Sequence, residues 1–160
     1  MAKNITITRR ERTTLAEITT RITTFAGFAV DAGIVGPEAT AKHPGSNLTI
    51  AALGAVHNFG IEVPERPWAT SVLESGALRR RIGGVYSGGL RKIMRGRGTA
   101  RDLLDRVGET VSDAMKAVID DGLEPLAEST LARKGRASRG PPLRDTDVLY
   151  DAITWRVRTD

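Results

Sequence analysis

The sequence TARDLLDRVGETVSDAMKAVIDDG, residues 99–122, decides the fold because it predicts one long amphipathic helix. Thr99 and Asp102 have the spacing of a capping box, which places the first helical residue at Ala100. Gly122 and Pro125 end the helix. Its apolar positions are Leu103, Leu104, Val107, Val111, Met115, Val118 and Ile119. They recur every three or four residues, with acidic residues opposite, so one side of this helix must be buried.

Two short segments on either side of this helix are predicted to be β-strands. Residues 25–35, FAGFAVDAGIV, form a short apolar run that a Gly-Pro pair stops, as in a buried strand. Ile153, Trp155 and Val157 alternate with polar residues, as in a half-buried strand. Strands that bracket a set of helices predict an α+β fold, a small and mostly antiparallel sheet packed with two or three helices.

The chain is predicted to form a single domain over residues 13–160, preceded by an extended arm at residues 1–12. Its 160 residues are enough to bury a core. In the arm, Ile5 and Ile7 alternate with threonine, which fits a short edge strand or a loose tail.

Two further segments are interpreted from their residue types. Over residues 14–25 the apolar spacing favours a helix, whereas three threonine pairs favour a strand, so both remain open. Residues 37–47 contain Pro, Gly and Ser and are expected to form a loop. Asn47 or Thr49 is then expected to cap a helix over residues 50–58, which ends at Gly60.

The segment at residues 76–98 is basic and rich in glycine. Gly83-Gly84 and Gly88-Gly89 interrupt a helical pattern, and each interior glycine costs about 0.5–1 kcal/mol relative to alanine. The segment is therefore predicted to be a broken helix or a flexible, mobile basic loop. Its glycines lack the Walker spacing and the dinucleotide-binding pattern, so a nucleotide site is not expected.

Charge is unevenly distributed along the chain. The formal net charge is +5. Residues 76–101 contain eight basic residues and no acidic one, whereas residues 102–128 contain eight acidic residues and two basic ones. Such blocks suit a protein that binds copies of itself, or one that binds an anionic polymer with one face. The alternative is an ordinary solvated surface, or neutralisation of one block by the other.

Composition argues against most catalytic classes. The chain has no cysteine and only two histidines, His43 and His57, which argues against disulfides, thiol chemistry and histidine-rich metal sites. Asp120 and Asp121 fall at a predicted helix end, where acidic residues commonly serve as caps. No apolar run approaches the roughly 18 residues of a membrane span, and no signal peptide is expected. We therefore expect a non-enzymatic protein without metal or cofactor.

Four segments, in order, are similar to the virion-morphogenesis or tail-completion proteins of tailed bacteriophages. Residues 53–60 (LGAVHNFG) resemble a short helix with an aromatic-Gly ending, and residues 63–68 (VPERPW) a Pro-x-Arg-Pro-aromatic turn. Residues 126–135 (LAESTLARKG) resemble a run that ends in Arg-Lys-Gly. Residues 142–155 resemble a Pro-Leu-x-Asp-Thr-Gly-x-Leu ending before a final strand, except that Asp147 stands at the usual glycine. The resemblance covers about residues 28–158.

The resemblance implies a structural subunit of the head–tail neck that is made in the host cytoplasm and incorporated into the virion. It implies a homo-oligomeric ring, expected to be six-fold, around the DNA channel, in contact with other neck or tail proteins. A tail terminator that caps the tail tube is one alternative. A nonspecific nucleic-acid-binding protein, suggested by the basic segment, is another.

Two groups of residues are the candidate contact sites. Those expected to face packaged DNA or a neighbouring subunit are Arg79, Arg80, Arg81, Arg91, Lys92, Arg95 and Arg97. Those expected to anchor a subunit interface are Pro64, Arg66, Pro67 and Trp68, because the prolines stiffen an extended segment and the indole is a large apolar group. Trp155, on the last predicted strand, is expected to lie in the core.

Overall fold

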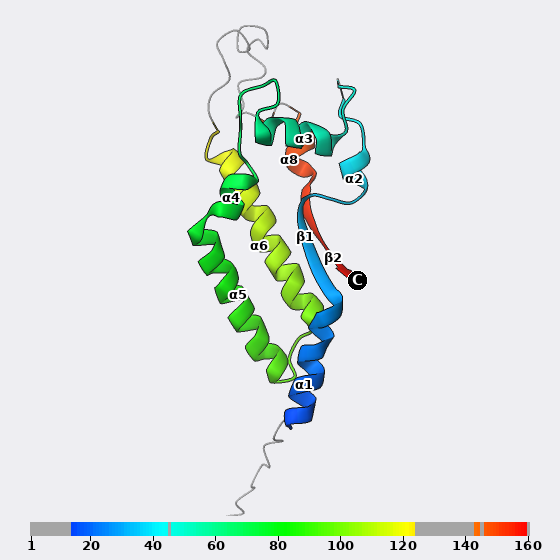
Figure 1. The fold of residues 1–160 in the computed structure, drawn as a ribbon, viewed down its shortest axis with the longest axis vertical. Helices are drawn as coiled ribbons and strands as arrows, with labels where there is room; N and C mark the ends of the chain where they lie inside the picture. The colour runs from blue at the N-terminus through cyan, green and yellow to red at the C-terminus, as the bar shows by residue number, and fades with distance from the viewer. Residues whose placement is uncertain (1–13, 45, 124–142, 145, 160) are drawn as a thin grey trace, which may run out of the picture.

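The computed structural model of the protein describes residues 14–44, 46–123, 143–144 and 146–159. These residues form an α+β fold, which confirms the predicted class. Figure 1 shows three layers: a two-stranded antiparallel sheet, helix α6 against it, and helix α5 against α6. The elements are α1 (Leu15–Thr23), a 3₁₀ turn (Thr24–Gly27), β1 (Phe28–Ile34), α2 (Pro37–Thr40), α3 (Ile50–Phe59), α4 (Thr70–Glu74), α5 (Gly76–Met94), α6 (Ala100–Asp120), α8 (Val148–Asp151) and β2 (Ile153–Thr159).

Helix α6 is the central element, and its predicted start is confirmed. The Thr99 backbone N–H donates to the Asp102 carboxylate at 2.8 Å, and the Asp102 N–H donates to the Thr99 hydroxyl at 3.1 Å. The apolar stripe is also confirmed: of the predicted positions only Val118 is half-buried, and the others are buried. The stripe contacts the sheet on one side and α5 on the other, so α6 joins the layers.

The sheet pairs β1 with β2 from Phe28–Thr159 to Ile34–Ile153. Ala32 and its partner Trp155 belong to the face toward α6. A Cβ atom at Gly108 of α6 would come within 2.5 Å of the Trp155 indole, so Trp155 packs inside its own chain, as expected. The opposite face exposes an ion-pair group, in which the Asp31 carboxylate accepts from the side chains of Arg156 and Arg158 at 3.1 and 3.3 Å.

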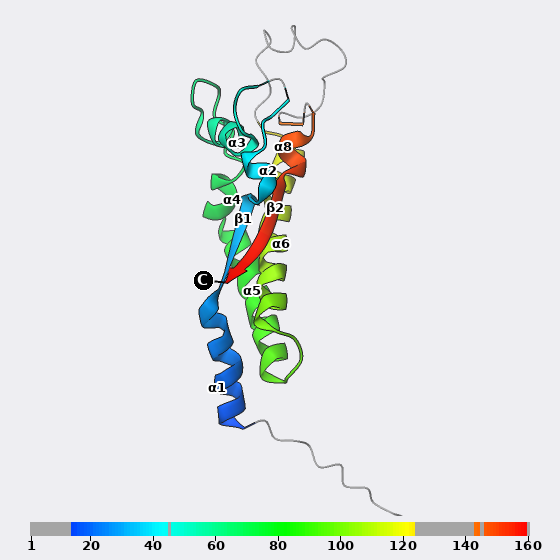
Figure 2. The same ribbon diagram turned by 90° about the vertical axis from the view of Figure 1, so that its right-hand side faces the viewer.

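The segment at residues 14–25, for which the sequence left a helix and a strand open, contains helix α1. Thr14 and Glu17 form a capping box at its start, with hydrogen bonds of 2.8 and 3.3 Å. Figures 1 and 2 show α1 projecting from the end of the sheet that is farthest from α3 and α8. The Arg21 guanidinium donates to the Met94 carbonyl at 3.1 Å and ties α1 to the end of α5. The predicted arm, residues 1–12, lies outside the described residues.

Helix α5 contradicts the prediction of a loop or broken helix at residues 76–98. It runs without interruption from Gly76 to Met94, and its break comes only at Gly96, where φ is 73°. Leu78 and Ile93 are buried, and four further apolar side chains of α5 are half-buried against the rest of the core. Fully burying one large apolar side chain contributes about 1.5–3 kcal/mol, so this packing outweighs the helix penalty of the glycines.

The end of the molecule around α3 differs from the prediction in one detail. Residues 37–40, expected as loop, form the one-turn helix α2, which begins at a proline, a residue well suited to the first helical position. Thr49, rather than Asn47, caps α3, since its hydroxyl accepts from the Ala52 N–H at 3.2 Å. Gly60 ends α3 with φ of 66°, as predicted. None of the helices in the described part of the chain is long and apolar enough to cross a membrane.

Candidate functional site

The outer side of α5 carries the basic residues that the sequence singled out, and we name this surface the cationic face. Its members are Arg79, Arg80, Arg81, Arg91, Lys92, Arg95 and Arg97, of which Arg95 is the C-cap of α5 and Arg97 follows it. All seven are exposed. The Arg79 guanidinium donates to the Glu74 carbonyl at 3.1 Å, but none of the seven forms an ion pair with a described residue. The structure therefore brings these residues together on one helix.

The cationic face is divided into two clusters by a stretch without long side chains. Arg79, Arg80 and Arg81 form the first cluster, and the remaining four residues form the second. Between them the exposed positions are Gly83, Gly84, Ser87 and Gly88. A Cβ atom at any of these three glycines would meet nothing within 4 Å. The middle of the face is therefore smooth and sterically open.

An open groove of about 1190 Å³ runs between α5 and α6 along the second cluster. Lys92, Arg95 and Arg97 line one side, and on the other side α6 contributes Asp102, Asp105 and Glu109 together with Arg106. At its inner edge Gly89 lies close to Leu103, because a Cβ atom there would come within 2.4 Å of a Leu103 methyl group. The groove thus places unlike charges on neighbouring helices without joining them in an ion pair among the described residues.

The acidic side of α6 is mostly occupied by contacts within the chain. Asp102 caps its own helix, and the Thr99 N–H holds the pKa of this carboxyl below its usual range. The Asp105 carboxylate Oδ2 lies 3.9 Å from Nε of Arg101, one helical turn earlier. Glu109 and Asp113 are exposed and form no ion pair with another described residue. Few acidic side chains of α6 therefore remain available to a second molecule.

The proposed interface anchors belong mainly to the interior, which corrects the prediction. Trp68 is only 4% exposed, and its indole N–H donates to the Gly54 carbonyl at 3.1 Å. Pro67 is half-buried, and only Pro64 is exposed. Two prolines and a tryptophan are equally compatible with a subunit interface and with a core, and no local signal in the sequence distinguishes the two locations. Trp68 here anchors the fold of its own chain.

Arg66 is also buried, at 4% exposure, which a sequence alone rarely predicts for arginine. Its Nη1 lies 3.5 Å from His57 Nδ1 and 3.4 Å from the Pro64 carbonyl, while its Nε has no partner among the described residues. The Arg66 backbone N–H donates to the His57 carbonyl at 2.7 Å. These contacts hold the Pro-rich turn against α3, so Arg66 stabilises the fold of its own chain.

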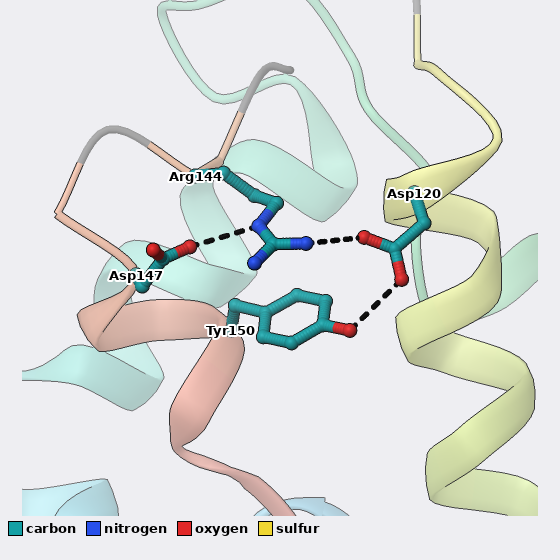
Figure 3. A network of polar contacts seen from close by, with 4 residues as sticks. All are labelled: Asp120, Arg144, Asp147 and Tyr150. Carbon is teal, nitrogen blue, oxygen red and sulfur yellow. Dashed lines mark hydrogen bonds and ion pairs between the residues drawn. The ribbon is translucent and has the colours of Figure 1, made fainter. Parts of the chain in front are cut away.

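A polar network that sequence reasoning missed fixes the residues before α8 to the end of α6 (Figure 3). Arg144 bridges two carboxylates, Asp120 at 2.6 Å and Asp147 at 2.8 Å, and the Tyr150 hydroxyl donates to Asp120 at 2.8 Å. The Arg144 guanidinium also lies 4.1 Å from the centre of the Tyr150 ring. Asp120 therefore links two segments, and its interpretation as a helix cap misses this role.

Asp147, the residue at which the sequence departs from the resembled pattern, has a backbone conformation that favours glycine. Its φ of 53° lies in the left-handed region, which glycine adopts most easily and aspartate tolerates better than most residues. The Asp147 carboxylate gains an ion pair with Arg144 that glycine could not make. The turn is therefore kept in a glycine-like conformation by a residue that adds a contact.

This network makes the stability of the folded protein depend on pH in the acidic range. The hydrogen bond from Tyr150 and the bond from Arg144 lower the pKa of Asp120 from its usual value. The stabilisation is therefore complete above the unfolded pKa of about 3.9 and is lost as the pH falls through the folded pKa. We expect Asp120→Asn to lower the Tm near neutral pH, and the difference from wild type to shrink below about pH 4. Circular dichroism melts over a pH series measure this.

Tyr150→Phe is the matched control for this network. It keeps the ring beside Arg144 but removes the hydroxyl that donates to Asp120, so it should reproduce only part of the Asp120→Asn effect. A Tm difference for Asp120→Asn that stays constant into strong acid would show that the carboxylate charge is not what stabilises the fold.

The described residues contain no group of three or more His, Asp or Glu side chains that could hold a metal ion. No family model, curated protein or solved structure matches this chain. The third resembled segment, residues 126–135, lies outside the described residues. The first, second and fourth correspond to α3, to the turn after it that contains the buried Arg66 and Trp68, and to the segment that leads into β2.

Proposed function

We propose that this chain is a non-enzymatic structural subunit of the neck of a tailed bacteriophage, which helps to join a filled head to a tail. It assembles with copies of itself into a ring, expected to be six-fold, around the channel through which DNA passes. Its partners are these copies and other neck or tail proteins, and it resides in the virion after synthesis in the host cytoplasm.

One observation supports this proposal beyond the sequence resemblance. Seven exposed cations lie on the cationic face, and no described acidic residue forms an ion pair with them. A protein that surrounds DNA must present a surface that a dense line of phosphates does not repel. On α6 two exposed acidic side chains, Glu109 and Asp113, form no ion pair with a described residue, so the subunit also has a smaller surface of opposite charge. A closed ring needs two unlike, complementary surfaces on each copy.

The same cations also favour the second candidate function, a nonspecific nucleic-acid-binding protein outside the virion. Deletion of the gene from a phage that encodes it, with complementation in trans, separates the two. We expect unjoined filled heads and free tails in electron micrographs of the deletion, and joined particles after complementation. Tails of uncontrolled length would instead indicate a terminator, and normal infectious virions would exclude every neck or tail role.

A further inference from the structure

We infer that the cationic face of α5 lies across a groove of duplex DNA, with one cluster on each of the two phosphate backbones, and binds it without reading its sequence. This inference rests on the proposed function only for the source of the duplex, which is the packaged genome. The contact itself follows from charge, spacing and side-chain size on α5.

Charge favours a polyanion over a second copy of the chain as the occupant. The cationic face offers seven exposed positive groups. The acidic side of α6 leaves Glu109 and Asp113 without an ion pair to a described residue, because Asp102, Asp105 and Asp120 contact their own chain. The two unpaired carboxylates of α6 cannot balance seven cations, and other exposed acidic residues, such as Glu38, Glu62 and Asp151, are spread over α2, the turn after α3 and α8. Duplex DNA carries one negative charge per roughly 1.7 Å of helix axis, which is enough to neutralise all seven cations.

Spacing favours a contact that bridges two backbones. Arg80 and Arg91 are eleven positions apart on the same side of α5, which separates their Cα atoms by about 16 Å along the helix axis. The major groove of B-DNA is about 12 Å wide. Arginine side chains at both ends can therefore reach the phosphates on either side of one groove while the helix lies across it.

The middle of the face explains why such a contact would not be sequence-specific. Between the clusters the exposed side is made of Gly83, Gly84, Ser87 and Gly88. Base edges are read by side chains long enough to enter the groove, such as arginine, asparagine and glutamine. The Ser87 hydroxyl is short and already donates to the Gly83 carbonyl at 2.8 Å. What remains are phosphate contacts, which fix position but carry no sequence information.

The test is the salt dependence of binding by the purified full-length protein to two short duplexes of unrelated sequence, followed by fluorescence anisotropy. Neutralising five to seven phosphates predicts a slope of log K against log salt between about −4.5 and −6.3. The two duplexes should bind equally. Arg80→Gln with Arg91→Gln, one residue from each cluster, should reduce the slope by about 2.

The matched control is Arg156→Gln with Arg158→Gln, which removes the same charge from the outer face of the sheet, where Asp31 accepts from both side chains. This pair should leave the slope unchanged. All four arginines are exposed, so circular dichroism should show folded protein in both cases. A third variant, Gly84→Glu with Gly88→Glu, keeps every cation but adds charge to the middle, and it should abolish binding.

Four results would overturn the inference: no binding at about 50 mM salt, an equal loss with the control pair, a strong preference for one duplex, or oligomers that dissociate with the α5 pair while DNA binding persists. The last would identify a second copy as the occupant. The gene deletion tests the neck separately. If an α5 variant that no longer binds DNA still joins heads to tails, the proposed neck function stands without this contact. If deletion of the gene has no effect on virions but the protein binds DNA, only the nucleic-acid contact stands.

Discussion

Replacing Trp68 with alanine is expected to destabilise the protein by about 3–5 kcal/mol, the usual cost of removing a buried tryptophan. Trp68 is 4% exposed and belongs to the main core cluster with Val72, Met115 and Ile153. The change also leaves the Gly54 carbonyl without its indole partner. Because domains are stable by only about 5–15 kcal/mol in total, much of the native stability would be lost. Urea denaturation gives the change in unfolding free energy.

Two variants in the same segment locate the origin of this effect. Trp68→Phe keeps much of the packing and loses the indole N–H, so it should cost less than alanine. Pro64→Ala alters the one exposed member of the predicted anchors and should change stability by no more than about 0.5 kcal/mol. If Trp68→Ala instead kept wild-type stability and only weakened self-association, Trp68 would be an interface anchor and our placement of it in the core would be wrong.

Replacing Gly108 with alanine should have the second large effect, a loss of about 1–3 kcal/mol from overpacking. A methyl group there would come within 2.5 Å of the Trp155 ring and 2.7 Å of the Trp155 Cβ atom. The ring could change its rotamer, but the Cβ atom is fixed to the backbone of β2. Relief therefore requires the sheet to move away from α6. Thermal and chemical denaturation measure the loss.

Gly88→Ala is the control with the opposite sign. Gly88 also lies inside a long helix, but a Cβ atom there meets nothing within 4 Å. Alanine should therefore stabilise the protein by about 0.5–1 kcal/mol, through helix propensity alone. If Gly108→Ala stabilised the protein as Gly88→Ala does, Trp155 would not lie against α6 as the structure places it.

Local pattern was enough to predict the elements whose residues agree at every level. In α6 the capping box and the apolar stripe point to the same helix, and both are found. In α5 two signals conflict: the glycines disfavour a helix, whereas the apolar residues Leu78, Ile82, Val85 and Ile93 have helical spacing. Contact with α6 decides in favour of the helix, and that contact is tertiary. Propensity is a weak guide wherever packing supplies more free energy than the backbone costs.

The candidate site was partly predictable for the same reason. The basic residues of this segment can be recognised from the sequence, and the structure adds that they are exposed and that most of them lie on one uninterrupted helix. The use of Trp68, Arg66 and Asp120 was not predictable, because their partners lie elsewhere in the chain. Asp120 meets Arg144 across 24 positions, and Trp68 meets Gly54 across 14. A spacing rule cannot identify such partners.

The pairing of β1 with β2 has a consequence for how the protein forms during translation. Asp31 on β1 and its partner Arg156 on β2 are 125 positions apart. At synthesis rates of about 5–20 residues per second, β2 follows β1 after about 6–25 s. Meanwhile the apolar side of α6 that will meet β2 is uncovered, and among the described residues made before β2 no strand pairs with β1. The two-stranded sheet can therefore form only after β2 has left the ribosome.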